Sequence, residues 1–275
     1  MSKADGLALL ARARTADAVT AALSVISAGN PSLREAILER YQNIGADPRR
    51  LDADGAIRAA LLRGLRTCAL GADVGLMEEA VQTYEFGAHG TRSEHGEVAC
   101  NLRAAGLLTL ADLDERLAAF HATRLLADQF TAKGSREPAL TAVRLLAATG
   151  HQLTLYTHLL LGAPVGEEAA ECFRALAGAP ASVLLDLAQR WQSSADETAL
   201  LGMFDTLLCH QQLDRFGPLV MQFIEESPLL DLVAYVATAI VAGHREALVG
   251  PLQDRRDLPG ARGEAVRDAL TLRPG

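Results

Sequence analysis

Six helical segments of this chain share a common frame, and this internal repetition constrains the fold more than any other feature. In each segment apolar residues recur at three- and four-residue steps, which gives a helix one apolar face that needs a neighbour. The aligned positions follow one another at steps of 40, 41, 30, 31 and 33 residues: Arg63, Arg103, Arg144, Arg174, Asp205 and Thr238. Each framed helix is followed by a break and a second helix, so we predict a repeating helical hairpin.

Short glycine and proline turns separate these helices. The turn signals are Gly71, Gly106, Gly150, Gly162–Pro164, Gly178–Pro180, Ser227–Pro228 and Gly243. Glycine ends helices because it tolerates left-handed backbone, and proline suits a first turn because its missing N–H would have no partner there. Apolar residues make up 49% of the chain but aromatic residues only 4%, and the excess is Ala and Leu, which favour helices. The sequence therefore predicts an all-α fold.

Two segments inside this frame carry a family resemblance. Residues 136–150 (REPALTAVRLLAATG) resemble the first helix of a HEAT-type repeat, and residues 167–178 (EEAAECFRALAG) are similar to a second copy. The resemblance extends over roughly residues 55 to 250 and implies a right-handed α-solenoid of HEAT-like (armadillo-type) hairpins. Tetratricopeptide repeats are the nearest alternative, but their length is almost constant at about 34 residues and their aromatic positions are mostly absent here.

The first fifty residues differ from the rest. Three shorter helices are expected at 7–14, 17–27 and 32–44. A stack of repeats needs a cap, because its terminal repeat would otherwise leave an apolar face in water. We therefore interpret residues 1–50 as an N-terminal helical cap and residues 51–275 as a repeat array continuous with it.

Charge and hydropathy limit the partners. The net charge is −8, and it is uneven: residues 1–66 hold ten basic and seven acidic groups, and the remainder sixteen basic and twenty-seven acidic. Nucleic-acid binders need basic patches to neutralise phosphates, so nucleic acid is not the expected partner. The longest apolar stretch, residues 232–242, falls short of the ~20 residues that cross a bilayer. We expect a cytoplasmic protein, with no membrane contact and with reduced cysteines buried as small apolar residues.

The most polar segment, residues 85–97, contains the weak metal candidates His89, Glu94 and His95. Imidazole and carboxylate groups bind divalent metals, but the spacing of the two histidines does not place them on one helix face. A solvated loop between repeats is the simpler interpretation. Asp52 and Asp54 resemble a fragment of a calcium loop without its final glutamate, and a helix cap by Asp54 explains them more simply. We expect neither a metal nor a cofactor.

Motifs of nucleophilic, nucleotide-binding and zinc-dependent enzymes are absent from the sequence, which favours binding over catalysis. In a solenoid the second helices usually line the concave binding face. Candidate binding residues on those helices are His121, Arg124, Tyr156, His158, Arg190, Trp191, Gln222 and Glu225. In the alternative interpretation Tyr156 and Trp191 pack between repeats and the others are solvated.

Two functional hypotheses follow. The first is a helical-repeat interaction or scaffold module that binds a protein or peptide on its concave face. The second is a HEAT-like enzyme or accessory factor, similar to DNA glycosylases or to bilin lyases, which the resemblance to HEAT-like folds allows.

Overall fold

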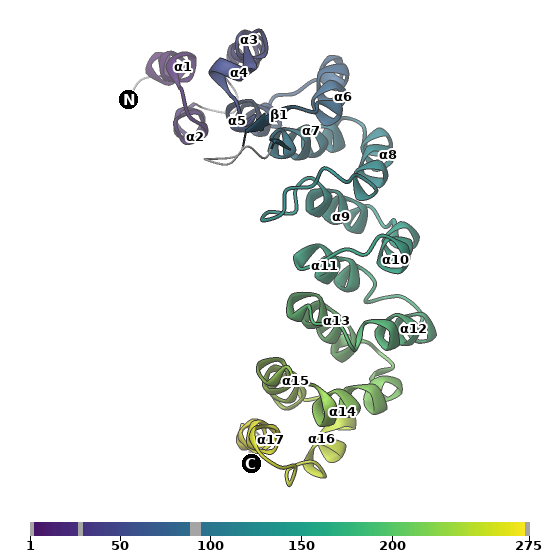
Figure 1. Ribbon diagram of the computed structural model, residues 1–275. Coiled ribbons are helices and arrows are strands. Elements are labelled where there is room, and N and C mark those ends of the chain that lie inside the picture. Colours follow the sequence, from purple (N-terminus) through teal and green to yellow (C-terminus); the bar gives the residue numbers. More distant parts are fainter. Residues whose placement is uncertain (1–2, 27–29, 89–94, 273–275) are drawn as a thin grey trace. The chain divides into compact units, whose positions relative to one another are not determined.

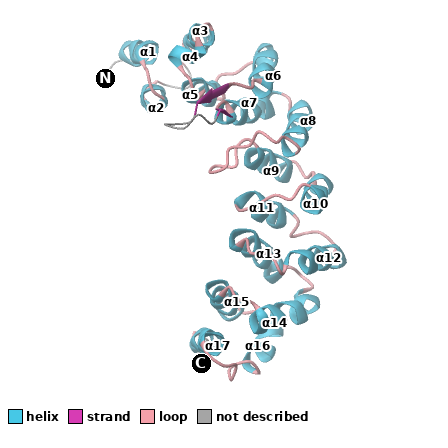
Figure 2. Cartoon of the chain, in the orientation of Figure 1, coloured by secondary structure: helices cyan, strands magenta, loops and turns pink. Residues whose placement is uncertain are grey.

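The computed structural model describes residues 3–26, 30–88 and 95–272, and these form an all-α protein with one short β-hairpin (Figures 1 and 2). The prediction of an all-α fold is confirmed. The chain divides into two compact units, unit 1 (Met1–Gly150) and unit 2 (His151–Gly275). No helix in the described ranges combines the length and the apolar content that a membrane span requires.

Unit 1 begins with short helices and continues with helices packed around a central one. Its elements are α1 (Lys3–Arg12), α2 (Ala16–Ser24), α3 (Leu33–Gly45), α4 (Pro48–Leu51), α5 (Ala56–Leu65), the 3-10 helix η1 (Gly71–Asp73), α6 (Val74–Gln82), β1 (Phe86–Ala88), β2 (His95–Glu97), α7 (Cys100–Leu113), α8 (Glu115–Leu126) and α9 (Ala139–Ala148). The three helices predicted before residue 50 are present, within a few residues of the expected ends. They pack on each other and on α5.

Unit 2 consists of helical hairpins in two layers. Its elements are α10 (Gln152–Leu161), α11 (Glu167–Ala175), α12 (Ala181–Trp191), α13 (Glu197–Cys209), the 3-10 helix η2 (Leu213–Phe216), α14 (Gly217–Glu226), α15 (Leu230–Ala242), α16 (Glu246–Gln253) and α17 (Ala261–Thr271). The framed helices α11, α13 and α15 pack in succession, followed by α17. The second helices α10, α12, α14 and α16 form the other layer (Figure 1).

Helix α7 is the centre of unit 1. It contacts α5, α6, α8 and α9, and nearly every position of its first three turns is buried. A helix that is covered on all sides has no solvent-facing stripe, so any charged residue in it must find partners inside the protein. This condition applies to Arg103, which lies in the first turn of α7.

Gly106 was predicted to mark a turn, and that prediction is wrong because the residue lies within α7. A Cβ atom at this position would lie 2.9 Å from Ala80 Cβ and 3.2 Å from the backbone nitrogen of Val81. The glycine therefore lets α6 approach α7 closely. A glycine in a helical sequence often marks a turn, but Gly106 is explained by the close packing of two helices.

Burial of the cysteines follows the prediction only in part. Cys100 and Cys172 are buried, Cys68 is partly buried, and Cys209 is exposed. Cys209 is the last residue of α13.

The close approach of α6 and α7 gives a first test. Gly106→Ala should force the two helices apart and lower the free energy of unfolding by about 1–3 kcal/mol, as overpacking does. Gly75→Ala is the matched control, because a Cβ added to Gly75 of α6 would meet no atom within 4 Å, and it should raise stability by about 0.5–1 kcal/mol. Urea denaturation followed by far-UV circular dichroism measures both. Equal stability of the two variants would show that α6 and α7 do not pack as described.

Candidate functional site

The hairpin of β1 and β2 interrupts the succession of helices between α6 and α7. Its strands are antiparallel, with Phe86 opposite Glu97. Just outside it, the N–H of Val98 donates to the carbonyl of Glu85 at 2.8 Å. We expected a solvated loop here, and that prediction is wrong for the two ends of the segment. They are paired, and both of their glutamates bind arginines from the helices beneath.

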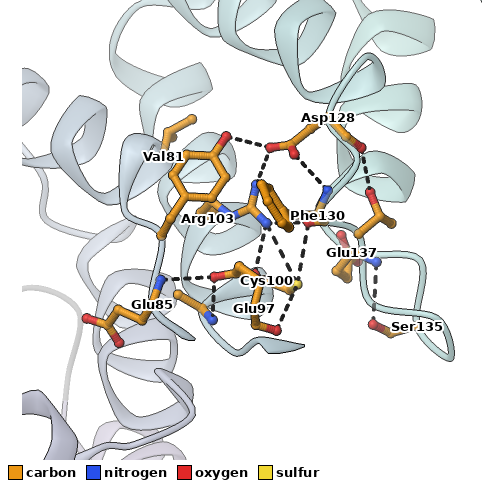
Figure 3. A network of polar contacts seen from close by, with 12 residues as sticks. Val81, Glu85, Glu97, Cys100, Arg103, Asp128, Phe130, Ser135 and Glu137 are labelled. Carbon is orange, nitrogen blue, oxygen red and sulfur yellow. Dashed lines mark hydrogen bonds and ion pairs between the residues drawn. The ribbon is translucent and has the colours of Figure 1, made fainter. Parts of the chain in front are cut away.

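Arg103 holds the second strand of the hairpin to α7. Its guanidinium is fully buried, 2.9 Å from Glu97 Oε2 and 2.6 Å from Asp128 Oδ2, and the two carboxylates are only 3% and 7% exposed. It also donates to the carbonyl of Phe130. Figure 3 shows the guanidinium between the two carboxylates. One buried cation thus joins β2, α7 and the segment that follows α8.

Both carboxylate oxygens of Glu97 accept hydrogen bonds. Its Oε1 accepts from the N–H of Ala99 at 2.7 Å, and its Oε2 accepts from the Cys100 thiol at 2.7 Å as well as from Arg103. Burial and the adjacent Glu97 carboxylate raise the pKa of the Cys100 thiol to about 11. A thiol that stays protonated at neutral pH is a poor nucleophile. The cluster is therefore suited to holding structure and not to nucleophilic chemistry.

Asp128 connects the buried cluster to the surface. Its Oδ2 accepts from the Tyr84 hydroxyl at 2.5 Å, and its Oδ1 accepts from the N–H of Phe130 at 2.8 Å. Burial, and then the hydrogen bond to Asp128, raise the pKa of Tyr84, so its hydroxyl remains a donor. The Tyr84 oxygen accepts in turn from Arg124 at 3.1 Å. Arg103 also stacks on the Tyr84 ring, 4.4 Å from its centroid, in a cation–π contact.

A second arginine holds the start of the hairpin. Arg58, on α5, makes a two-pronged pair with Glu85, at 2.8 and 2.6 Å. It also contacts Asp52 at 2.9 Å, and Asp52 accepts from the N–H groups of Ile57 and of Arg58 itself. Asp54 accepts from the first N–H of the helix, that of Ala56, at 3.1 Å, as predicted, and Asp52 accepts from the next two. Arg58 and Arg103 together fix both strands to the helical core.

The clamped hairpin presents an aromatic surface. The Phe130 ring meets the rings of Tyr84 and Phe86 edge-on, with centroids 5.8 and 5.3 Å apart. Phe86 is 53% exposed, and Phe120, one turn before Arg124 on α8, is 66% exposed. We call Tyr84, Phe86, Phe120, Arg124 and Phe130 the aromatic–arginine surface. Exposed aromatic side chains that lie together are a mark of binding surfaces.

Two hollows flank Phe86 and Tyr84. One, of about 550 Å³, is lined by Tyr84, Phe86, Arg124, Ala127, Asp128, Gln129 and Phe130. The other, of about 590 Å³, is lined by Pro48, Arg49, Ala53, Tyr84, Glu85, Phe86, Gly87 and Val98. Both volumes fall within the range of about 300–1,000 Å³ that ligand sites occupy.

Of the predicted binding residues, two lie in unit 1. Arg124 belongs to the aromatic–arginine surface. His121 is buried on α8, with Nε2 3.1 Å from Glu78 Oε1, so it connects α8 to α6.

The other six lie on three helices of unit 2 and form no common cluster. On α10, His158 is buried 2.8 Å from Glu168, and Tyr156 is half-buried. On α12, Trp191 packs edge-on against Phe173 at 5.5 Å, in line with the packing interpretation.

The remaining three predicted residues each have a partner within unit 2. Arg190 pairs with Asp186 on its own helix at 3.1 Å. On α14, Gln222 bonds Glu226 at 3.0 Å, and Glu225 pairs with Arg255 at 2.7 Å.

The metal candidates receive little support from geometry. His89 and Glu94 lie outside the described residues, and His95 stands in β2 opposite Ala88. Within the described ranges, no group of three or more histidine, cysteine or acidic side chains is arranged to hold a metal ion.

The residues that build the site were mostly missed by sequence reasoning. Glu85 and Glu97 were recognised only as polar loop residues, and Asp128 and Phe130 were not singled out. One signal was available: Arg103 interrupts an otherwise apolar, alanine-rich helix, so it required buried acidic partners. The nearby glutamates of the polar segment were the natural candidates.

Comparison of the chain with models of protein families, with characterised proteins and with solved structures finds no match.

The buried arginine gives a second test. Arg103→Met leaves Glu97 and Asp128 buried without their cation and should lower the free energy of unfolding by about 3–5 kcal/mol. Arg66→Ala is the matched control, because its ion pair with Asp112 is 40% and 42% exposed and should contribute about 0–1 kcal/mol. Denaturation of the full chain by urea, followed by circular dichroism, measures both. A loss below 1 kcal/mol in Arg103→Met would mean that the cluster is dispensable.

Proposed function

We propose that this protein is a HEAT-like helical-repeat interaction module that binds a peptide segment of a partner protein on its aromatic–arginine surface. The supporting observation is exposed Phe86, which contacts Phe130 and lines two hollows, in a protein with only 12 aromatic residues. Phe120, also exposed, lies one turn before Arg124 on α8. Exposing large apolar side chains has a cost in water, and covering them stabilises a complex by roughly 25 cal/mol per Å².

Rigidity supports the same proposal. The Phe86 backbone is fixed in a strand, and the rings of Tyr84 and Phe130 are held by the Arg103–Asp128 cluster. A surface that is already ordered loses little conformational entropy when it binds. Tyrosine, tryptophan and arginine dominate the energetic centres of interfaces, and Tyr84 and Arg124 provide two such side chains.

The shape of the surface favours an extended peptide. Tyr84 and Phe86 line both hollows, so a segment that crosses them can place one side chain in each. Charge argues against a nucleic-acid backbone. Unit 1 carries 17 basic and 18 acidic residues, and unit 2 carries 9 and 16, so neither unit has the basic excess that phosphate neutralisation requires.

Peptide selection tests this function. Random linear dodecapeptides displayed on phage are selected on the immobilised full chain, and the enriched pool is then titrated on variants. Phe86→Ala should weaken retention of the pool by about tenfold or more, as expected for a central interface residue. The matched control is Leu161→Ala, which removes an apolar side chain that is 81% exposed in unit 2 and should leave retention unchanged.

Two results would contradict the proposed function. One is the absence of any enriched peptide. The other is an enriched pool that the Phe86→Ala variant retains as well as the original chain does. Far-UV circular dichroism of the variant, unchanged from the original, shows that the hairpin change has not unfolded the protein.

A further inference from the structure

On the exposed face of α8, one arginine lies one turn before Phe120 and another lies one turn after it. Arg116, Phe120 and Arg124 follow one another at four-residue steps and are all exposed, so they form one stripe on the helix. Among the described residues, neither arginine lies within ion-pair distance of a carboxylate. On the far side of Phe86, exposed Arg49 lines the second hollow. Positive charge therefore borders the aromatic residues on both sides.

The acidic groups beneath this surface already have partners. Glu97 and Asp128 are buried against Arg103, and Glu85 is paired with Arg58. The exposed carboxylates Glu79 and Glu115 line neither hollow. The buried groups carry a net charge of −2, from two arginines and four carboxylates, but each of these carboxylates is paired with an arginine. The exposed charges that border the hollows are those of Arg49 and Arg124.

Two hydrogen bonds hold the Arg124 guanidinium in position, and its other N–H groups can still donate to a ligand. One terminal nitrogen donates to the Tyr84 hydroxyl at 3.1 Å and the other to the carbonyl of Val81 at 3.3 Å. A guanidinium has five N–H donors in a planar fork, so these two bonds orient the group and leave three donors for a ligand. A positioned fork of this kind matches the two oxygens of a carboxylate.

We propose that the bound segment is acidic: it places an apolar side chain in the hollow beside Phe86 and Phe130 and its Asp or Glu carboxylates on Arg124 and Arg116. This inference rests on the proposed function and adds the chemistry of the partner. Carboxylates on a peptide explain the combination of an aromatic hollow with separate arginines, because each side chain of an extended segment can meet a different group.

The test uses a peptide from the selection, labelled with fluorescein, and its isosteric twin in which every Asp and Glu is replaced by Asn and Gln. Fluorescence anisotropy with the full chain gives both dissociation constants. We expect the enriched peptides to carry a net negative charge and the twin to bind about tenfold more weakly, which corresponds to 1.4 kcal/mol. Arg124→Ala should weaken the acidic peptide and reduce the difference between the two peptides.

Two controls make the result specific. Arg256→Ala, which removes an arginine of unit 2 that is 66% exposed, should change neither dissociation constant. A single-stranded oligothymidylate is added as a competitor, because aromatic and arginine side chains can also stack on bases. The oligothymidylate should not displace the peptide. If it displaces the peptide at a concentration comparable to that of the peptide, the inference is overturned in favour of a nucleic-acid ligand.

The outcomes separate this inference from the proposed function. If neutral or basic peptides are enriched and Phe86→Ala releases them, the binding function stands and the acidic partner is wrong. If the acidic peptide and its twin bind equally well, the inference fails in the same way. If no enriched peptide depends on Phe86, both proposals fail.

Discussion

The burial of Arg103 is the interaction on which the candidate site depends. A guanidinium without solvent contact is unfavourable unless charge and hydrogen bonds replace water. Here two carboxylates, a backbone carbonyl and the face of Tyr84 do so. These partners come from β2, from the segment after α8 and from the segment before β1. The requirement of one buried cation therefore fixes three irregular segments in a protein that is otherwise built from helices.

The placement of this cluster explains why aromatic side chains can be held at the surface. Ion pairs in the interior are weak contributors to stability compared with apolar packing, but the hydrogen bonds within them are directional and so favour one geometry. Asp128 also orients Arg124, because it accepts from the Tyr84 hydroxyl, whose oxygen in turn accepts from Arg124. The buried polar groups thus give orientation, and the exposed rings give the area that a partner covers. This division between a rigid interior and an apolar exterior is what a preformed binding surface needs.

Sequence reasoning succeeded where the signal is local and failed where it is not. The helical frame could be predicted, because the three- and four-residue steps of apolar residues lie within single helices. The cluster could not, because Arg103 and Asp128 lie 25 positions apart and meet only after α7 and α8 have packed. Arg63 and Arg103 occupy the same frame position, yet Arg63 is exposed and Arg103 is buried, so position in the repeat did not decide burial. The helices that pack around each position determine whether its side chain is buried. Gly106 illustrates the same limit, since a glycine that permits close packing has the same sequence signal as one that ends a helix.

Hydrogen exchange can show whether Arg103 holds the hairpin and the segment after α8, because it reports on the backbone amides of both. In the full chain, the amides of Val98 and Phe130 are hydrogen-bonded to Glu85 and Asp128 and should exchange slowly. In Arg103→Met we predict faster exchange in peptides that cover residues 95–99 and 128–131, with exchange in α11 and α13 unchanged. Unchanged exchange in the hairpin and in the segment after α8 would contradict the account, because it would show that these segments keep their order without the buried cation.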